Sequence, residues 1–254
     1  MKGFIAVIPV RMASQRLPGK ALLEIEGRPM ISWVWERARR SRADEIVIAT
    51  DDERIRAVAA DMGAEVEMTA ATHASGTDRI AEVARRRGWH RDQIVVNVQG
   101  DEPLLPPALV DQVADLLERH RDAGMATLTT PVRNREEFVD PHMVKVVTDR
   151  LGHALYFSRA PIPTSRDGDF PRDARRHVGI YAYRAATLAL LAATPPCELE
   201  ETERLEQLRA LWLGQRIAVA DAVELPPRGV DTADDLDHIR RLAVSQLRAE
   251  RPTG

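Results

Sequence analysis

Three basic residues and a glycine stand close together near the start of the sequence, where they could bind phosphate. In IPVRMASQRLPGKAL, Arg11, Arg16 and Lys20 surround Gly19 directly after the apolar run FIAVIPV (4–10). Ligands of open parallel sheets lie at the carboxyl ends of the strands, and several cations on a glycine-bearing loop suit a polyphosphate. Solvated surface charge is the competing interpretation. We predict that this loop binds a phosphate-bearing ligand.

The loop differs from the two most familiar phosphate-binding motifs. A Walker A loop has a glycine five residues before its Gly-Lys pair and a Ser or Thr directly after it, whereas Ser14 and Ala21 stand at those positions. The dinucleotide fingerprint G-x-G-x-x-G does not follow the first apolar run. The sequence therefore predicts another kind of nucleotide-binding loop.

Two aspartates far apart in the sequence are candidate ligands for the Mg²⁺ that usually accompanies a nucleoside triphosphate. Asp101 follows VNVQG (96–100), and Asp231 lies in GVDTADDL. Mg²⁺ prefers oxygen ligands and typically takes one or two protein carboxylates. For Asp231 the residues alone favour another role, because either Asp231 or Thr232 can cap the helix that follows, and capping is the more common role of an Asp-Thr pair before a helix.

A further polar segment, HASGTDR (73–79), lies between an expected strand and an expected helix. Ser75 or Thr77 acting as a helix cap explains the hydroxyl side chains, but capping does not explain His73 or Arg79. The first turn of a helix also offers free N–H groups to an anion. The residues themselves leave the role of this segment open.

The elements that must position these residues alternate along the chain. Short apolar, β-branched runs are typical of strands covered on both faces, and the segments between them have helical spacing. The expected strands are 4–10, 45–50, 64–68 and 93–99, and the expected helices are 29–41, 52–63 and 76–88. This order predicts an α/β fold with a doubly wound, mostly parallel sheet.

The pattern changes in the second half of the chain. Strand-like segments with few helices between them indicate a mixed or antiparallel, β-rich excursion around 130–185. A Glu- and Leu-rich helix over 199–213 and a C-terminal helix from Thr232 are expected after it, and PTSRDGDFPRD (163–173) is a long loop. We expect a single domain over 1–254.

Composition limits the function classes. The chain has 254 residues, 44% hydrophobic and 30% charged, with a net charge of −3, which offers no overall attraction for nucleic acid or a membrane surface. The single Cys197 excludes an internal disulfide, and the N-terminus lacks a signal peptide pattern. We therefore expect a cytoplasmic protein with no nucleic-acid or membrane partner.

The sequence pattern assigns no site role to most of the histidines or to one of the lysines. The chain has only three lysines, of which Lys145 has no assigned role. The remaining histidines show no metal-binding spacing and are expected to be surface or structural residues; they are His90, His120, His142, His153 and His238.

The motif R-x-x-S-x-R-L-P-G-K-x-L, followed in order by VNVQGDEP, HVGIYAYR, LEQLR and GVDTxxDL, resembles the 3-deoxy-manno-octulosonate cytidylyltransferase family. The similarity runs from about Phe4 to the helix after Asp231. It implies a fold of the nucleotide-diphospho-sugar transferase type and transfer of CMP from CTP to the anomeric hydroxyl of the acidic sugar Kdo, for lipopolysaccharide synthesis. It also implies Mg²⁺ as cofactor and a homodimer formed through the β-rich excursion.

The resemblance implies roles for particular residues. Lys20 would contact the α-phosphate, Arg11 and Arg16 the β- and γ-phosphates, and Asp101 and Asp231 the metal, with Lys20, Arg11 and Asp101 as the catalytic set. The nucleotide side would also include His73, Ser75, Gly76, Arg79 and Gln99, and the sugar side Gln99, Arg159, His177, Tyr181, Glu206 and Gln207. Two alternatives stay open. One is the same reaction on 8-amino-Kdo or another acidic sugar, and the other is a non-catalytic sugar-nucleotide sensor.

Overall fold

The computed structural model describes residues 3–13, 17–73 and 75–249. The strands are β1 (Phe4–Val10), β2 (Glu24–Ile25), β3 (Arg28–Pro29), β4 (Glu45–Thr50), β5 (Glu65–Met68), β6 (Ile94–Asn97), β7 (Met125–Pro131), β8 (Lys145–Thr148), β9 (Ala154–Ser158), β10 (Arg175–Arg184) and β11 (Ile217–Asp221). The helices are the short 3₁₀ turn η1 (Lys20–Leu22), α1 (Met30–Arg39), α2 (Glu53–Asp61), α3 (Gly76–Arg86), α4 (Pro107–Arg119), α5 (Arg135–Val139), α6 (Ala185–Ala193), α7 (Glu198–Glu203), α8 (Gln207–Trp212) and α9 (Ala233–Ala249).

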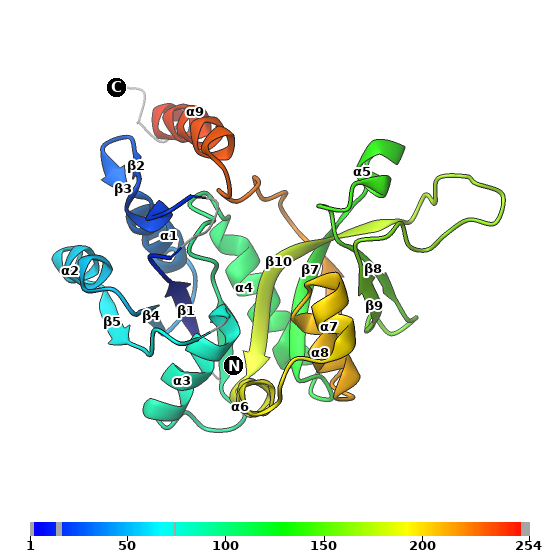
Figure 1. The fold of residues 1–254 in the computed structure, drawn as a ribbon, viewed down its shortest axis with the longest axis horizontal. Helices are drawn as coiled ribbons and strands as arrows, with labels where there is room; N and C mark the ends of the chain where they lie inside the picture. The colour runs from blue at the N-terminus through cyan, green and yellow to red at the C-terminus, as the bar shows by residue number, and fades with distance from the viewer. Residues whose placement is uncertain (1–2, 14–16, 74, 250–254) are drawn as a thin grey trace.

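Within the described residues the main sheet has nine strands, in the order β11-β7-β10-β6-β1-β4-β5, with β8 and β9 attached beside β10 (Figure 1). Strand β1 pairs in parallel with β4 and β6, and β7 pairs in parallel with β11. Strand β10 is antiparallel to both β6 and β7. The predicted α/β fold with a mixed, mostly parallel sheet is confirmed.

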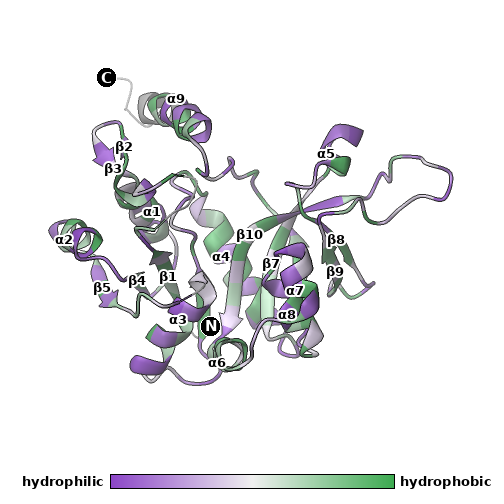
Figure 2. Ribbon diagram, in the orientation of Figure 1, coloured by the Kyte–Doolittle hydropathy of each residue, from purple (hydrophilic) through white to green (hydrophobic). Residues whose placement is uncertain are grey.

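Alternate residues of β1 show why the sheet is covered on both faces. Ala6 and Ile8 pack in one hydrophobic cluster with residues of α1, α2 and α4. Ile5 and Val7 pack in a second cluster with residues of α3, α6 and α8. Successive side chains of a strand point to opposite faces, so an uninterrupted apolar run is required here, and Figure 2 shows β1 as hydrophobic. The apolar run ends at Val10, where the loop that carries Arg11 and Lys20 begins.

The expected helix over 199–213 is wrong, because the structure divides it. Helix α7 ends at Glu203, the next residue Arg204 has a left-handed backbone with φ 54°, and α8 begins at Gln207. The break turns Leu205 into the core while Glu206 stays exposed. The preceding helix α6 packs against α3 and was not predicted. Its sequence AATLALLAA is almost entirely apolar, so no polar stripe indicates a helical period.

Two further features complete the fold. Helix α9 packs on the small β2–β3 hairpin through a cluster that includes Ile25, Val230 and Leu236. Strands β8 and β9 and the segment that leads to β10 project from the rest of the molecule (Figure 1), in the region of the predicted β-rich excursion. Among the described residues, no helix combines the length and the apolar character that crossing a membrane requires.

Candidate functional site

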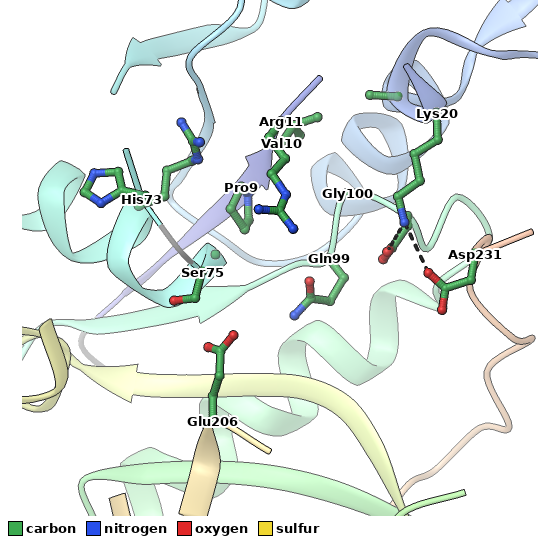
Figure 3. Close-up of a pocket in the computed structure, with 14 residues that line it drawn as sticks. Pro9, Val10, Arg11, Lys20, His73, Ser75, Gln99, Gly100, Glu206 and Asp231 are labelled. Carbon is green, nitrogen blue, oxygen red and sulfur yellow. Dashed lines mark hydrogen bonds and ion pairs between the residues drawn. The ribbon is translucent and has the colours of Figure 1, made fainter. Parts of the chain in front are cut away.

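The loop after β1 brings Lys20 to the carboxyl-terminal edge of the sheet. Gly19 has φ +68°, a conformation that favours glycine, and its N–H donates to the Met12 carbonyl at 3.1 Å. This closes the loop and starts η1 at Lys20. Arg11 is exposed and its guanidinium points into the adjacent pocket (Figure 3). Arg16 lies outside the described residues.

Lys20 joins the two aspartates that the sequence analysis proposed as metal ligands. Its ammonium lies 2.6 Å from Asp101 Oδ2 and 3.4 Å from Asp231 Oδ1, and it donates to the Val230 carbonyl at 3.1 Å (Figure 3). The side chains of Lys20, Asp101 and Asp231 are 18%, 30% and 46% exposed, respectively. Residues from three distant segments therefore form one cluster that solvent and a ligand can reach.

Close backbone approach explains why the three segments meet. A Cβ on Gly100 would lie 3.0 Å from the Pro9 carbonyl oxygen and 2.9 Å from Val10 Cγ2, so only glycine lets the end of β6 run this close to the end of β1. The carbonyl of Asp101 in turn accepts a hydrogen bond from Val230 N–H at 2.8 Å. That bond fixes the chain directly before Asp231.

The capping question at the start of α9 has a clear structural answer. Asp235 N–H donates to Thr232 Oγ1 at 3.2 Å, and Asp235 Oδ2 accepts from the N–H of Thr232 at 2.9 Å. This reciprocal arrangement is a capping box. Thr232 therefore caps the helix, and the Asp231 carboxylate faces Lys20 instead.

The cluster borders a cavity of about 340 Å³ between the first loop and the start of α3. Ser75 caps α3 by accepting from Asp78 N–H at 3.1 Å, and Gly76 places the first turn beside Pro9, because a Cβ there would lie 3.2 Å from Pro9 Cγ. The N–H groups of this first turn have no partner inside the helix. They add partial positive charge to the cavity.

His73 and Arg79 line the same cavity, yet both are already paired with protein groups. His73 Nε2 lies 2.5 Å from Glu82 Oε2. The Arg79 side chain is buried and lies 3.1 Å from Asp51 Oδ2. These pairs shape the cavity wall whether or not the two side chains also contact a nucleotide.

A second cavity of about 320 Å³ adjoins the first and shares Gln99, Asp101 and Glu206 with it. Five of the six residues expected on the sugar side line this cavity, namely Gln99, His177, Tyr181, Glu206 and Gln207, and Arg159 does not. Two buried polar atoms of its wall, Asn97 Oδ1 and Gln207 Nε2, have no hydrogen-bond partner among the described residues. Such atoms are rare in proteins, and they suit a ligand rich in hydroxyl groups.

This second cavity is also lined by Thr77, Asn97 and Tyr183, none of which was assigned to it from the sequence. The sequence did contain a sign that Asn97 belongs to a site, because it is a polar residue in the otherwise apolar run of β6. Tyr183 is buried and alternates with Tyr181 along β10, so its sequence context is that of a core residue. Thr77 Oγ1 donates to Glu206 Oε2 at 2.8 Å, a contact between distant segments that spacing alone does not reveal.

Glu206 lies at the junction of the two cavities and points into the pocket from the break between α7 and α8 (Figure 3). Although the residue retains accessible surface, that surface faces the cavity. Desolvation raises the pKa of the Glu206 carboxyl above its ordinary value, and the hydrogen bond from Thr77 opposes the shift. Its position allows contact with ligands in both cavities.

Burial lowers the pKa of His177 to about 3, and the charge of Arg176 adds to the shift. His177 Nε2 lies 3.0 Å from Thr127 Oγ1, whose single proton can be donated to the Ile180 carbonyl at 2.7 Å. The hydroxyl therefore accepts from His177 Nε2–H. At neutral pH His177 is an uncharged ring with its proton on Nε2.

This pKa leads to a prediction about acid stability. In the unfolded chain a histidine has a pKa near 6.5, whereas folded His177 titrates at about 3. Between these values the unfolded state binds a proton that the native state does not, so stability falls as the pH falls. We expect the free energy of unfolding, measured in urea at about pH 7 and about pH 5, to decrease more in the wild type than in His177→Gln. The same decrease in both proteins would contradict the role of His177 in this pH dependence. His142→Gln changes an exposed histidine, is the matched control, and should behave like the wild type.

Arg159 and Lys145 have structural contacts that the sequence did not predict. Arg159 lies outside both cavities; its guanidinium donates to the carbonyls of Glu203 and Pro141 at 2.6 and 3.0 Å. Lys145 is fully buried and donates to the carbonyls of Asp140, Met143 and Arg159 at 2.8, 2.5 and 2.7 Å. Three acceptors match the three protons of an ammonium group. Lys145 therefore ties the chain after α5 to the end of β9.

Comparisons with known proteins agree with this geometry. A family model described as "Cytidylyltransferase" matches residues 5–217. The 3-deoxy-manno-octulosonate cytidylyltransferase of Pseudomonas fluorescens is 55% identical over 247 residues, which cover 94% of this chain and 97% of that protein. The enzyme of the same name from Thioalkalivibrio sulfidiphilus is 54% identical, with 94% and 98% covered.

Solved structures give the same result. A CMP:2-keto-3-deoxy-manno-octonic acid synthetase complexed with CTP superposes with a TM-score of 0.90 and 39% identity, over 96% of this chain and 100% of that one. A 4-diphosphocytidyl-2C-methyl-D-erythritol synthase, with a TM-score of 0.64 and 13% identity over 96% of this chain and 99% of that one, shares the fold alone.

Proposed function

The chain belongs to the 3-deoxy-manno-octulosonate cytidylyltransferases, and from this premise we propose that its two adjoining cavities hold CTP and Kdo for the transfer of CMP. The anomeric oxygen of Kdo forms a bond to the α-phosphorus of CTP, and the bond between that phosphorus and the bridging oxygen of pyrophosphate breaks. The observation that carries the proposal is the convergence of Lys20, Asp101 and Asp231 beside two connected cavities.

We propose that the first cavity binds the triphosphate. Attack at the α-phosphate places negative charge on the phosphoryl oxygens and on the leaving pyrophosphate, so catalysis depends on positioning and charge stabilisation. Lys20 supplies an ammonium at the cavity wall, Arg11 supplies a guanidinium that points into it, and the α3 N-terminus adds backbone N–H groups at Ser75 and Gly76. Arg16 is proposed as a further phosphate ligand on the strength of the family motif alone.

The donor set at Lys20 fits Mg²⁺. Asp101 and Asp231 present carboxylate oxygens to one point, both partly exposed, and Mg²⁺ takes one or two carboxylates with phosphate oxygens and water completing its octahedron. We propose these two residues as its protein ligands. When bound, Mg²⁺ offsets the charge of the triphosphate and polarises the reacting phosphoryl group.

We propose that the second cavity binds Kdo. Gln99, His177, Tyr181 and Gln207 line it with polar groups, and Glu206 at the junction can orient a sugar hydroxyl toward the α-phosphate. The proton of the attacking hydroxyl passes to water or to a nearby carboxylate. Arg159 stays a proposed ligand of the Kdo carboxylate, a role that would require its guanidinium to leave the backbone carbonyls it now contacts.

An assay of pyrophosphate release tests the function. We expect turnover with CTP and Kdo in the presence of Mg²⁺, loss of turnover when EDTA removes divalent cations, and full recovery when Mg²⁺ is restored. UTP and ATP are controls for the nucleotide, and 8-amino-Kdo and a sialic acid are controls for the sugar. Faster turnover of 8-amino-Kdo would identify the sister reaction, whereas CTP binding without turnover would identify a sensor.

We further propose a single nucleotidyltransferase domain that works as a cytoplasmic homodimer and supplies lipopolysaccharide synthesis. The excursion offers support for the dimer, because Leu151 and Leu155 there are 57% and 61% exposed and Trp212 in the adjacent α8 is 60% exposed. Clustered exposed apolar side chains are typical of protein interfaces.

A further inference from the structure

Three side chains that commonly bind transition metals meet on the side of the sheet away from the two cavities. His120, Asp122 and His153 each offer one nitrogen or oxygen atom, and these atoms lie within 4.8 Å of one another. His120 follows α4, Asp122 lies in the next turn, and His153 directly precedes β9. Their separation in the sequence hides the cluster from any spacing motif, and the expectation that His120 and His153 show no metal arrangement is therefore incomplete.

Strand pairing shows that the cluster is separate from the proposed active site. In β10, Tyr181 pairs with Asn97 near the carboxyl end of β6, whereas Arg184 pairs with Ile94 at its amino end. The Arg184 guanidinium lies 3.4 Å from the His120 carbonyl. The cluster thus lies at the amino-terminal edge of the sheet, and the two cavities lie at the opposite edge.

The backbone holds the two segments of the cluster in place. The His120 carbonyl accepts from Ala123 N–H at 3.0 Å, which closes the turn that carries Asp122. His153 forms an isolated bridge with Ala218 of β11. The ligand atoms therefore approach one another without any need for a change of fold.

His153 has the surroundings of a metal-binding imidazole. The residue is only 7% exposed, and its Nε2 has no hydrogen-bond partner among the described residues while lying 3.6 Å from Asp122 Oδ2. On the other side of the ring, Asp149 Oδ2 lies 3.6 Å from Nδ1. Metal-binding histidines commonly have a carboxylate beside the second ring nitrogen, which places the proton there and leaves the first nitrogen free for the metal.

We propose that His120, Asp122 and His153 bind a divalent transition-metal ion of the zinc class, with Asp149 orienting His153. Two imidazoles and a carboxylate form a three-ligand set that Zn²⁺ accepts with water in the fourth position. Arg216 Nη1 lies 2.5 Å from Asp122 Oδ2 and competes for that carboxylate. A carboxylate has about four acceptor positions, so Asp122 can contact Arg216 and the ion together. The ion would link the turn after α4 to the turn between β8 and β9.

Zinc binding by the full-length, untagged chain in excess Mg²⁺ tests the proposal, because excess Mg²⁺ should fill the site proposed at Asp101 and Asp231. We expect one Zn²⁺ per chain in competition with a chromophoric chelator, and a rise in the unfolding temperature when Zn²⁺ is added. Replacement with Co²⁺ should give the strong visible absorption of a tetrahedral ion. Binding should persist in Asp101→Asn, which keeps this result independent of the proposed function.

Matched variants decide the ligand set. His153→Gln and His120→Gln should weaken Zn²⁺ binding more than tenfold and abolish the cobalt spectrum, and Asp149→Asn should weaken it about tenfold. His90→Gln makes the same change at a histidine whose side chain is 70% exposed and should have no effect. If the buried His153 variant fails to fold, His120→Gln alone decides, because His120 is only partly buried. Equal zinc binding by the wild type and His120→Gln would overturn the proposal.

Discussion

Lys20→Met should lower kcat/KM by a factor on the order of 10² to 10³, which is about 3 to 4 kcal/mol of transition-state stabilisation. Methionine keeps the length of the side chain and removes its charge. The ammonium now lies 2.6 Å from Asp101, 3.4 Å from Asp231 and at the wall of the first cavity, where it can meet the charge that develops on the α-phosphate. Steady-state pyrophosphate release with CTP and Kdo measures the loss.

A matched control separates this effect from a general loss of positive charge. Arg28 is a cation of the adjacent hairpin that pairs with Glu36 at 2.7 Å and lies outside both cavities. Arg28→Met should retain activity within about twofold. Lys20→Arg should recover little, because a planar fork does not replace a compact ammonium between two carboxylates. A loss of less than about threefold in Lys20→Met would exclude Lys20 from the transition state.

The core architecture was predictable because buried parallel strands have an unmistakable sequence pattern. FIAVIPV and EIVIAT are nearly continuous apolar runs, and both faces of β1 and β4 are covered as that pattern requires. The candidate ligands Asp101 and Asp231 could be paired in advance only through the family motifs. Spacing alone left Asp231 and Thr232 as equal candidates for the helix cap, and the hydrogen bonds of Asp235 decide between them.

Other features depend on contacts that no local pattern contains. Arg204 adopts a left-handed backbone, which for a non-glycine residue is imposed by the tertiary structure, so the division of the expected helix could not be read from composition. Lys145 is buried because three carbonyls from two separate segments converge on it, two after α5 and one at the end of β9. Arg159 was expected to have an anionic partner, because a charged residue beside apolar strand residues needs one. In this structure its guanidinium has partners, but they are backbone carbonyls.

Asp101→Asn and Asp231→Asn should each reduce the rate by a factor of about 10² or more at low Mg²⁺. Each should also raise the Mg²⁺ concentration required for the half-maximal rate by about tenfold or more. Asparagine has the same shape as aspartate without its charge, so it weakens the attraction for a hard cation. The larger effect is expected at Asp101, whose side chain is 30% exposed against 46% for Asp231, because charge is screened less where solvent is scarcer. Rate measurements across a Mg²⁺ titration provide the test.

Combining the two changes distinguishes a shared metal site from two independent contributions. If both carboxylates bind one ion, removal of either abolishes most of its binding, so the double variant should be little worse than Asp101→Asn alone; separate roles would make the two losses multiply. Asp234→Asn, at an exposed acid three residues beyond Asp231, should leave the Mg²⁺ dependence unchanged. Because Thr232 and Asp235 form the helix cap, Asp231→Asn should also leave the free energy of unfolding nearly unchanged. A variant that instead lost stability and kept its Mg²⁺ dependence would show that Asp231 serves the helix and not the metal.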